Sequence, residues 1–220
     1  MKTPVKTRAL RKYEAEPRVV ASAAGEPRID LFSPFGPMIG KVRLPDGVVA
    51  KVNAFADTRA LRDKSSEFYV PPEVAFAGGE ESLARQTERL IARYLAGVEG
   101  SRVKAVRIEI FWIVSQYAGT PSPVHFHSGD ISGVAYLKVP EIADEAGEEA
   151  KTYISGRQAG YINFMIGGKQ NLSKSLISFR PAVADFYIFP GWLLHGAEPF
   201  RGKGERRSMA FNAYVDYADE

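Results

Sequence analysis

The sequence of 220 residues has no cysteine, and this absence excludes disulfide bonds, thiolate metal sites and cysteine nucleophiles. It has no apolar run near the roughly 20 residues that a membrane-spanning helix needs. Its basic start is not followed by the apolar core of a secretory signal. We therefore expect a soluble, cytoplasmic protein that has no membrane contact.

The sequence also has little excess of one charge. The net charge is +3 with a pI of about 9.0. Much of the positive charge lies near the N-terminus, and a basic segment of this kind can bind nucleic acid. However, little apolar material surrounds it, and no basic stripe with interleaved aromatic residues follows. We therefore expect no nucleic-acid partner. The length suits one domain, and we predict a basic N-terminal tail or arm over residues 1–27 and a single domain over residues 28–220. The basic residues near the start are Lys2, Lys6, Arg8, Arg11 and Lys12.

One helix stands out in the pattern of apolar residues. Over residues 80–96 they recur at helical spacing, with Glu80 and Glu81 in the first turn and Gly97 as a stop signal. Before it, residues 29–32 and 40–44 are predicted to form short strands, and Pro45-Asp46-Gly47 marks a turn after the second. The helix is expected to pack outside a sheet.

From residue 103 onward the sequence predicts one short strand after another, separated by Gly, Pro and Asn. Many short strands at regular spacing are typical of an all-β sandwich or barrel rather than of a sheet with crossover helices. The predicted strands include residues 106–114, 131–139, 152–154, 161–165, 175–179, 185–189, 192–196 and 206–217.

Histidine is scarce, with only His125, His127 and His195 in the chain. The first two flank Phe126, and on an extended chain residues i and i+2 point to the same face. Both imidazoles can therefore point toward one position. His195 follows the Pro-Gly turn after Phe189, and we expect its side chain to point toward the same position. A lone histidine is more often a surface or core residue, but three neutral imidazoles can cap one face of a metal's octahedron. The pattern favours a metal site at the mouth of the barrel.

The last strand carries a polar series on one face. Alternation places Arg206 and Ser208 together and Arg207 on the opposite face. A hairpin loop at residues 199–205 is expected to lay this strand beside that of His195. Arginine is suited to bidentate capture of a carboxylate, and a serine hydroxyl can add one bond. The alternative for Arg206 is a solvated residue at a sheet edge.

Together these residues resemble the Fe(II)/2-oxoglutarate-dependent dioxygenase superfamily, in particular a subgroup of small oxygenases. The resemblance spans residues 106 to 215, roughly half the chain, and implies an all-β fold, the double-stranded β-helix or cupin-like jelly roll, with one long outer helix. The shared motifs are His125-Phe126-His127, Ser132-Gly133-Val134-Ala135-Tyr136-Leu137, Phe189-Pro190-Gly191-Trp192-Leu193-Leu194-His195 and Arg206-Arg207-Ser208.

By this resemblance, His125 and His195 bind Fe(II), and Arg206 with Ser208 binds the far carboxylate of the co-substrate 2-oxoglutarate. The implied reaction oxidises a substrate, by hydroxylation, while 2-oxoglutarate is decarboxylated to succinate. The superfamily usually supplies a carboxylate as its third ligand.

In this chain the third-ligand position is His127. Asp130 is the alternative, since a turn at residues 128–129 would let its carboxylate swing toward the metal. We favour His127, because Asp130 would point to the opposite face of a straight strand.

Two other functions stay open at this point. A three-histidine cupin-type iron dioxygenase would need no 2-oxoglutarate, although it has no required use for Arg206. A non-enzymatic jelly-roll binding module would hold the histidines as structural residues and would purify without metal. Trp112, Tyr117 and Tyr136 are candidates for the pocket wall or for the core. The sequence leaves open the substrate, expected to be a small molecule, and whether the chain forms a homodimer.

Overall fold

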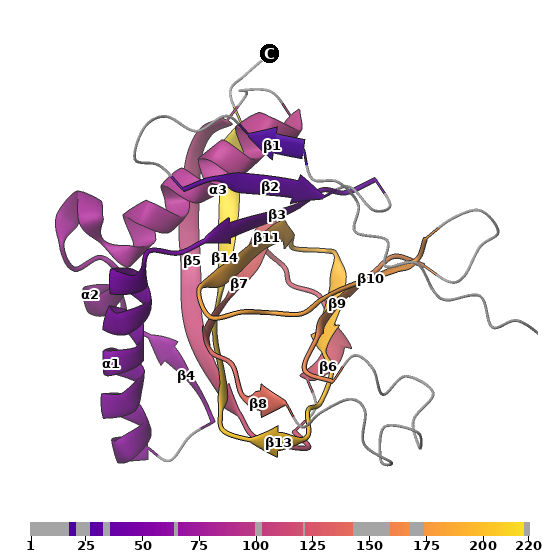
Figure 1. Cartoon of the computed structure of the whole chain (residues 1–220). Helices are drawn as coiled ribbons and strands as arrows, with labels where there is room; N and C mark the ends of the chain where they lie inside the picture. Colours follow the sequence, from indigo (N-terminus) through magenta and orange to yellow (C-terminus); the bar gives the residue numbers. More distant parts are fainter. Residues whose placement is uncertain are drawn as a thin grey trace, which may run out of the picture.

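The computed structural model confirms the predicted all-β jelly roll. Two antiparallel sheets face each other, and the helices cover the outer side of the larger one (Figure 1). The predicted strand at residues 152–154 and most of the predicted N-terminal arm lie outside the residues that the structure describes. Those described are residues 18–20, 27–32, 36–63, 66–99, 103–120, 122–142, 159–167 and 174–217.

The major sheet has eight strands in the order β1-β2-β3-β11-β7-β14-β5-β4. The two longest, β5 and β14, pair along most of their length, next to the edge strand β4. Short β1 falls within the predicted arm and pairs with β2 at one edge. The bounds are β1 Arg18–Val20, β2 Ile29–Phe32, β3 Ile39–Arg43, β4 Glu67–Val70, β5 Val103–Gln116, β7 Ile131–Lys138, β11 Asp185–Pro190 and β14 Arg206–Tyr217.

The minor sheet has the order β10-β9-β12-β6, with β6 Ser122–His125, β9 Ile162–Met165, β10 Leu176–Phe179 and β12 Leu194–Ala197. A separate pair joins β8 Glu141–Ile142 to β13 Gly202–Lys203. An aromatic-rich cluster fills the space toward the minor sheet. It consists of Ile39, Tyr136, Ile162, Phe164, Tyr187, Phe189 and Leu193.

The predicted pairing of the last strand with the His195 strand is wrong. β12 pairs with β6 and β9, whereas β14 pairs with β5 and β7. The reason is that the loop between them carries β13, which pairs with β8 instead of closing a tight hairpin. His195 and Arg206 therefore come from different sheets and meet across the barrel interior.

The expectation of one long helix is also wrong, because α1 Asp46–Asp63 is as long as α3 Leu83–Glu99. The predicted turn at its start is instead the first turn of α1: the carbonyl of Pro45 accepts hydrogen bonds from the backbone N–H groups of Val48 and Val49. Buried Val49, Val52 and Ala56 recur at helical spacing and hold α1 against the major sheet.

The helix that the sequence predicted at residues 80–96 is present but shifted. Glu80 and Glu81 lie in a short 3-10 helix, η1 Gly79–Glu81, and α3 begins after Ser82, whose Oγ accepts the backbone N–H of Arg85 at 3.3 Å. The helix continues through Gly97 to Glu99. A short α2 Pro72–Ala75 lies between β4 and η1.

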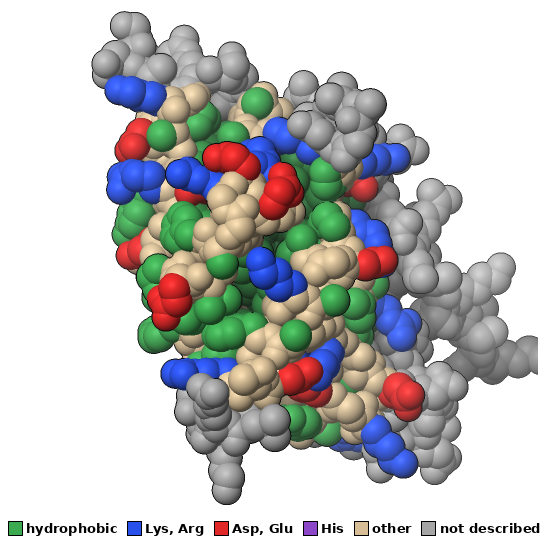
Figure 2. Space-filling view, turned by 90° about the vertical axis from the view of Figure 1, so that its left-hand side faces the viewer, with side chains coloured by type: hydrophobic (Ala, Val, Ile, Leu, Met, Phe, Trp, Pro, Cys, Tyr) green, Lys and Arg blue, Asp and Glu red, His purple; other side chains and the backbone are tan. Residues whose placement is uncertain are grey.

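The helical side of the molecule carries charges of both signs, interspersed among hydrophobic side chains (Figure 2). None of the described histidines shows on this face, so the candidate metal ligands lie elsewhere. Within the described part of the chain, no helix is long and apolar enough to cross a membrane.

Candidate metal centre and adjoining pocket

The structure brings the three histidines together. His125 and His195 are direct partners in the β6–β12 ladder, and His127 follows β6 by two residues. One ring nitrogen from each lies within 4.8 Å of the others, and the described residues form no other such group of possible metal ligands. These distances suit three ligands around one ion.

Backbone contacts orient two of the rings. Nδ1 of His125 lies 2.7 Å from the carbonyl oxygen of Pro123, and Nδ1 of His195 lies 2.9 Å from that of Leu193. A carbonyl only accepts, so each Nδ1 must donate, and the lone pair is then on Nε2. Such a bond fixes both the tautomer and the ring angle of a ligand histidine.

Electrostatics also favour metal binding. Burial lowers the pKa of His127 to about 4, with a smaller contribution from His125. Burial likewise lowers the pKa of His195 to about 4, although its bond to the Leu193 carbonyl opposes this. Both imidazoles are therefore neutral near pH 7, which is the form that binds a metal.

His127 lies in a loop rather than in a strand, and its backbone is fixed by the turn that follows β11. Its N–H donates to the carbonyl of Gly191 at 2.9 Å, and the N–H of Gly191 donates to that of Asp130 at 2.9 Å. A Cβ on Gly191 would collide with the carbonyl of Gly129, so this close approach requires glycine. The ring of Trp112 packs against that of His127, with 5.2 Å between the ring centroids.

Asp130 does not join the three histidines. Its Oδ2 instead accepts the backbone N–H of Val215 at 2.9 Å, where the ladder between β7 and β14 has ended. Asp130 therefore ties the His127 loop to the major sheet. The geometry favours His127 as the third ligand.

A cavity of about 90 Å³ adjoins the histidines. The predicted pair, Arg206 and Ser208, lines it together with Trp112 and Tyr136, while Tyr117 is exposed and does not. Both sheets contribute to its wall. The remaining lining residues are Val114, Gln116, Ser122, His125, His127, Gly133, Val134, Ile162, His195, Gly196, Ala197 and Ala210.

Arg206 is 2% exposed, which excludes the sheet-edge alternative. Its Nε and Nη2 donate to Oε1 of Gln116 at 3.0 and 2.8 Å, and Nη1 donates to the carbonyl of Glu198 at 2.7 Å. Its guanidinium lies over the ring of Phe200. Burial lowers its pKa from the ordinary value, but arginine stays protonated.

No carboxylate of the described residues forms an ion pair with Arg206. The charge of Glu198 raises the pKa of Arg206 less than burial lowers it, and Glu198 forms no ion pair with Arg206. A buried cation without an ion-pair partner is unfavourable, so the pocket fits a ligand that carries a carboxylate. The sequence did not point to Gln116. It is the last residue of β5, opposite Arg206 in the ladder, and only the strand register reveals it.

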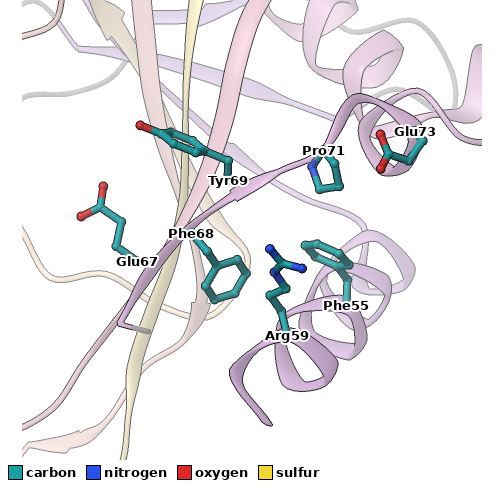
Figure 3. A pocket seen from close by; sticks show the side chains of 7 residues that line it. All are labelled: Phe55, Arg59, Glu67, Phe68, Tyr69, Pro71 and Glu73. Carbon is teal, nitrogen blue, oxygen red and sulfur yellow. The ribbon is translucent and has the colours of Figure 1, made fainter. Parts of the chain in front are cut away.

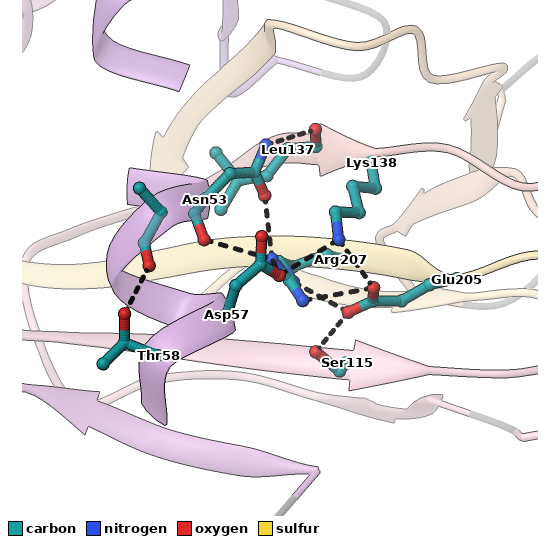
Figure 4. Close-up of polar contacts among 9 residues, drawn as sticks. Asn53, Asp57, Thr58, Ser115, Leu137, Lys138, Glu205 and Arg207 are labelled. Carbon is teal, nitrogen blue, oxygen red and sulfur yellow. Dashed lines mark hydrogen bonds and ion pairs between the residues drawn. The ribbon is translucent and has the colours of Figure 1, made fainter. Parts of the chain in front are cut away.

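Arg207 points to the other side of β14, as predicted, and lies in a dense polar cluster (Figure 4). It donates to Oε1 of Glu205 and to Oδ1 of Asp57, each at 2.7 Å. Lys138 bridges the same two carboxylates, and Ser115 donates to Glu205. This cluster joins α1 to the major sheet.

A wider cavity of about 560 Å³ lies on the helical side, between α1, β4 and the start of α2 (Figure 3). No histidine lines it, and its charged residues are of both signs, so its lining does not form a group of metal ligands or a site for an ion of one charge. Its lining residues are Phe55, Arg59, Glu67, Phe68, Tyr69, Pro71 and Glu73.

Residues 110–212 match the family model described as "Putative 2OG-Fe(II) oxygenase". This stretch runs from within β5 to within β14 and includes the histidines, Arg206 and Ser208. Just under half of the chain therefore matches a family of the Fe(II)/2-oxoglutarate-dependent dioxygenase superfamily. The chain is a non-haem iron enzyme that uses Fe(II) and, as co-substrate, 2-oxoglutarate.

Solved structures share the fold at low sequence identity. A viral collagen prolyl hydroxylase from Paramecium Bursaria Chlorella virus-1, bound to 2OG, is 15% identical, with a TM-score of 0.50 over 83% of this chain and 96% of that one. A Pseudomonas putida prolyl-4-hydroxylase is 13% identical, with a TM-score of 0.52 over 83% and 88%. HygX from Streptomyces hygroscopicus, with nickel and 2-oxoglutarate bound, is 13% identical, with a TM-score of 0.52 over 83% of each chain. None of the curated proteins matches the chain.

Proposed function

We propose that the chain holds one Fe(II) through His125, His127 and His195 and binds 2-oxoglutarate through Arg206 and Ser208. It would then oxidise a small-molecule substrate, by hydroxylation. One observation carries the proposal: three converging histidines and a buried arginine without an anionic partner line the same cavity, although they come from opposite sheets.

Fe(II) with 2-oxoglutarate would supply the oxidising chemistry, with dioxygen consumed and 2-oxoglutarate decarboxylated to succinate. The chain's own task is binding and orientation. The three imidazoles would hold the metal and would leave room for exchangeable ligands. The fixed Nδ1–H bonds of His125 and His195 keep their lone pairs aimed at that point.

At the deep end, the guanidinium of Arg206 and the hydroxyl of Ser208 would bind the far carboxylate of the co-substrate. The apolar side chains of Trp112, Val114 and Ile162 would exclude water around it. The primary substrate would approach at the outer end, where His125 is exposed while His195 is buried.

The alternative without 2-oxoglutarate leaves the charge of Arg206 without a use, and the match to the oxygenase family favours the 2-oxoglutarate enzyme. A non-enzymatic module would have no need for three imidazoles at one point.

The test combines elemental analysis with an anaerobic titration of 2-oxoglutarate, followed by the iron-to-ligand charge-transfer absorbance. The wild type is expected to bind one Fe(II) and to develop the band. His195→Ala should lose stoichiometric iron while it stays folded, as judged by circular dichroism. A wild type that binds iron but shows no band would contradict the co-substrate assignment, and full iron occupancy in the His195→Ala variant would contradict the metal assignment.

A further inference from the structure

The two contacts of Arg206 with Gln116 use one edge of its guanidinium. Oε1 of Gln116 accepts from both Nε and Nη2, and Glu198 accepts from Nη1 through its backbone carbonyl. These three bonds use three of the five N–H donors of an arginine. One N–H on each Nη is left, and two such groups are what a carboxylate needs for a bidentate pair.

The acceptors around Arg206 are both neutral. A glutamate side chain has the shape of glutamine, and at position 116 it would form a fork-like ion pair with the same edge. The chain has an amide there instead, although a buried cation costs less beside an anion. The next residue, Arg207, shows that the chain does supply carboxylates where a cation is to be neutralised, from Asp57 on α1 and from Glu205 just before β14.

We propose that Gln116 is a positioning residue for the co-substrate: it fixes the plane of the Arg206 guanidinium while leaving its charge uncompensated for the far carboxylate of 2-oxoglutarate. This inference rests on the proposed function, because it takes Arg206 as the co-substrate's partner. Gln116 acts through Arg206, and its neutrality is as important as its hydrogen bond.

Two substitutions separate orientation from charge. Gln116→Glu keeps the shape and the acceptor but supplies a permanent internal anion, which competes with the co-substrate. Gln116→Leu keeps the apolar bulk but removes the acceptor, so that Nε of Arg206 is left buried without its partner. Gln86→Glu on α3 is the matched control, because it adds the same charge at a position that does not line the pocket.

The matched ligands are 2-oxoglutarate and 2-oxopentanoate, which differ only by the far carboxylate. Each is titrated anaerobically into Fe(II)-loaded protein by calorimetry, and Tm is measured without ligand. In Gln116→Glu we expect the Kd of 2-oxoglutarate to rise on the order of 100-fold, as for the loss of one buried charge pair, with the Kd of 2-oxopentanoate unchanged and Tm equal or higher. Gln116→Leu should weaken 2-oxoglutarate by roughly 10-fold, the size of a lost hydrogen bond to a charged group, and should lower Tm.

Three results would overturn the proposal. In the first, Gln116→Glu binds 2-oxoglutarate as tightly as the wild type and Gln86→Glu do. In the second, Gln116→Glu weakens the binding of both 2-oxo acids equally. In the third, its affinity for 2-oxoglutarate falls and its Tm falls as well. The last two would show a merely structural role. Two other results would instead contradict the proposed function. The wild type would bind both 2-oxo acids equally tightly, or Arg206→Ala would still prefer 2-oxoglutarate. Failure of the proposed function is therefore distinguishable from failure of the role of Gln116.

Discussion

Arg206 and Arg207 are consecutive residues of β14, both nearly inaccessible, with opposite surroundings. Arg207 faces the helices and meets the carboxylates of Glu205 and Asp57 at 2.7 Å. Arg206 faces the barrel interior, and its hydrogen bonds go only to a side-chain amide and a backbone carbonyl. One face of the strand thus neutralises its cation within the chain, and the other does not.

The difference separates a structural cation from a binding cation. Each buried charge costs several kcal/mol unless it is paired. At Arg207 the chain supplies the anions, so the cluster is complete in the protein alone. At Arg206 an ion pair forms only when an anionic ligand binds. The favourable free energy of that ion pair therefore contributes to ligand binding and not to folding. The following predictions test this contrast.

The largest effect is expected for Arg207→Ala on stability. Its removal leaves Glu205, 13% exposed at its side chain, with only Lys138 and Ser115 as partners, and breaking a buried pair in this way costs up to about 3–5 kcal/mol. Chemical denaturation should show this loss. In the fraction that remains folded, 2-oxoglutarate should bind almost as in the wild type, because Arg207 does not line the pocket. A strong loss of co-substrate affinity at full folding would mean that the two faces are not independent.

Arg206→Ala should reverse this pattern. We expect it to retain iron but to lose about 2–5 kcal/mol of 2-oxoglutarate binding, the range for truncating one partner of a buried charge pair. Its stability without ligand should change less than that of Arg207→Ala, because no carboxylate of the described residues loses an ion pair. Anaerobic titration and denaturation of the two variants side by side measure both quantities. Equal profiles would remove the distinction between the two arginines.

A smaller effect concerns acid stability. The hydrogen bond from Arg207 lowers the pKa of Asp57. Burial alone would raise the pKa of Glu205, but bonds from Ser115, Lys138 and Arg207 outweigh it and lower the pKa. Carboxyl groups with a lowered folded-state pKa stabilise the protein above their unfolded values, near pH 4 to 5, and this stability is lost as the pH falls through the folded values.

The pH dependence of unfolding therefore checks the cluster. The free energy of unfolding should fall below about pH 4 to 5 in the wild type, and Arg207→Ala should flatten this dependence. Glu205 should contribute more than Asp57, whose side chain is 56% exposed and screened by solvent. An unchanged slope in the variant would show that the cluster does not hold these carboxyl groups in their charged form.

Local periodicity was enough to predict the faces of β14, because alternation along an extended chain is a local property. His125 and His127 do converge, but His127 lies in the loop after β6, where its backbone donates to the carbonyl of Gly191. Local periodicity could not predict strand partners. The sequence put β14 beside β12, but β13 diverts the loop to β8. Gln116 was missed for the same reason, since its relation to Arg206 comes from the β5–β14 register.

The helices show a second limit of local patterns. α3 has a clear apolar stripe and was found, whereas α1 begins at Pro45-Asp46-Gly47, which also suits a turn. Only packing of Val49 and Val52 against the sheet decides between the two. The division into an arm over residues 1–27 and one domain stays a prediction.

Asp130 belongs with Arg207 on the structural side of the contrast, and it gives the smallest expected effect. Its carboxylate accepts the N–H of Val215 and anchors the loop that carries His127. Asp130→Ala should therefore weaken metal binding only indirectly, by about 1 kcal/mol for one lost hydrogen bond. Asp130→Asn, which retains an acceptor oxygen, should restore it. His127→Ala should cost far more metal, since it removes a ligand. Competition for Fe(II) with a calibrated chelator ranks the three variants. If Asp130→Ala proves worse than His127→Ala, the carboxylate is the ligand after all, and the site is the two-histidine, one-carboxylate type.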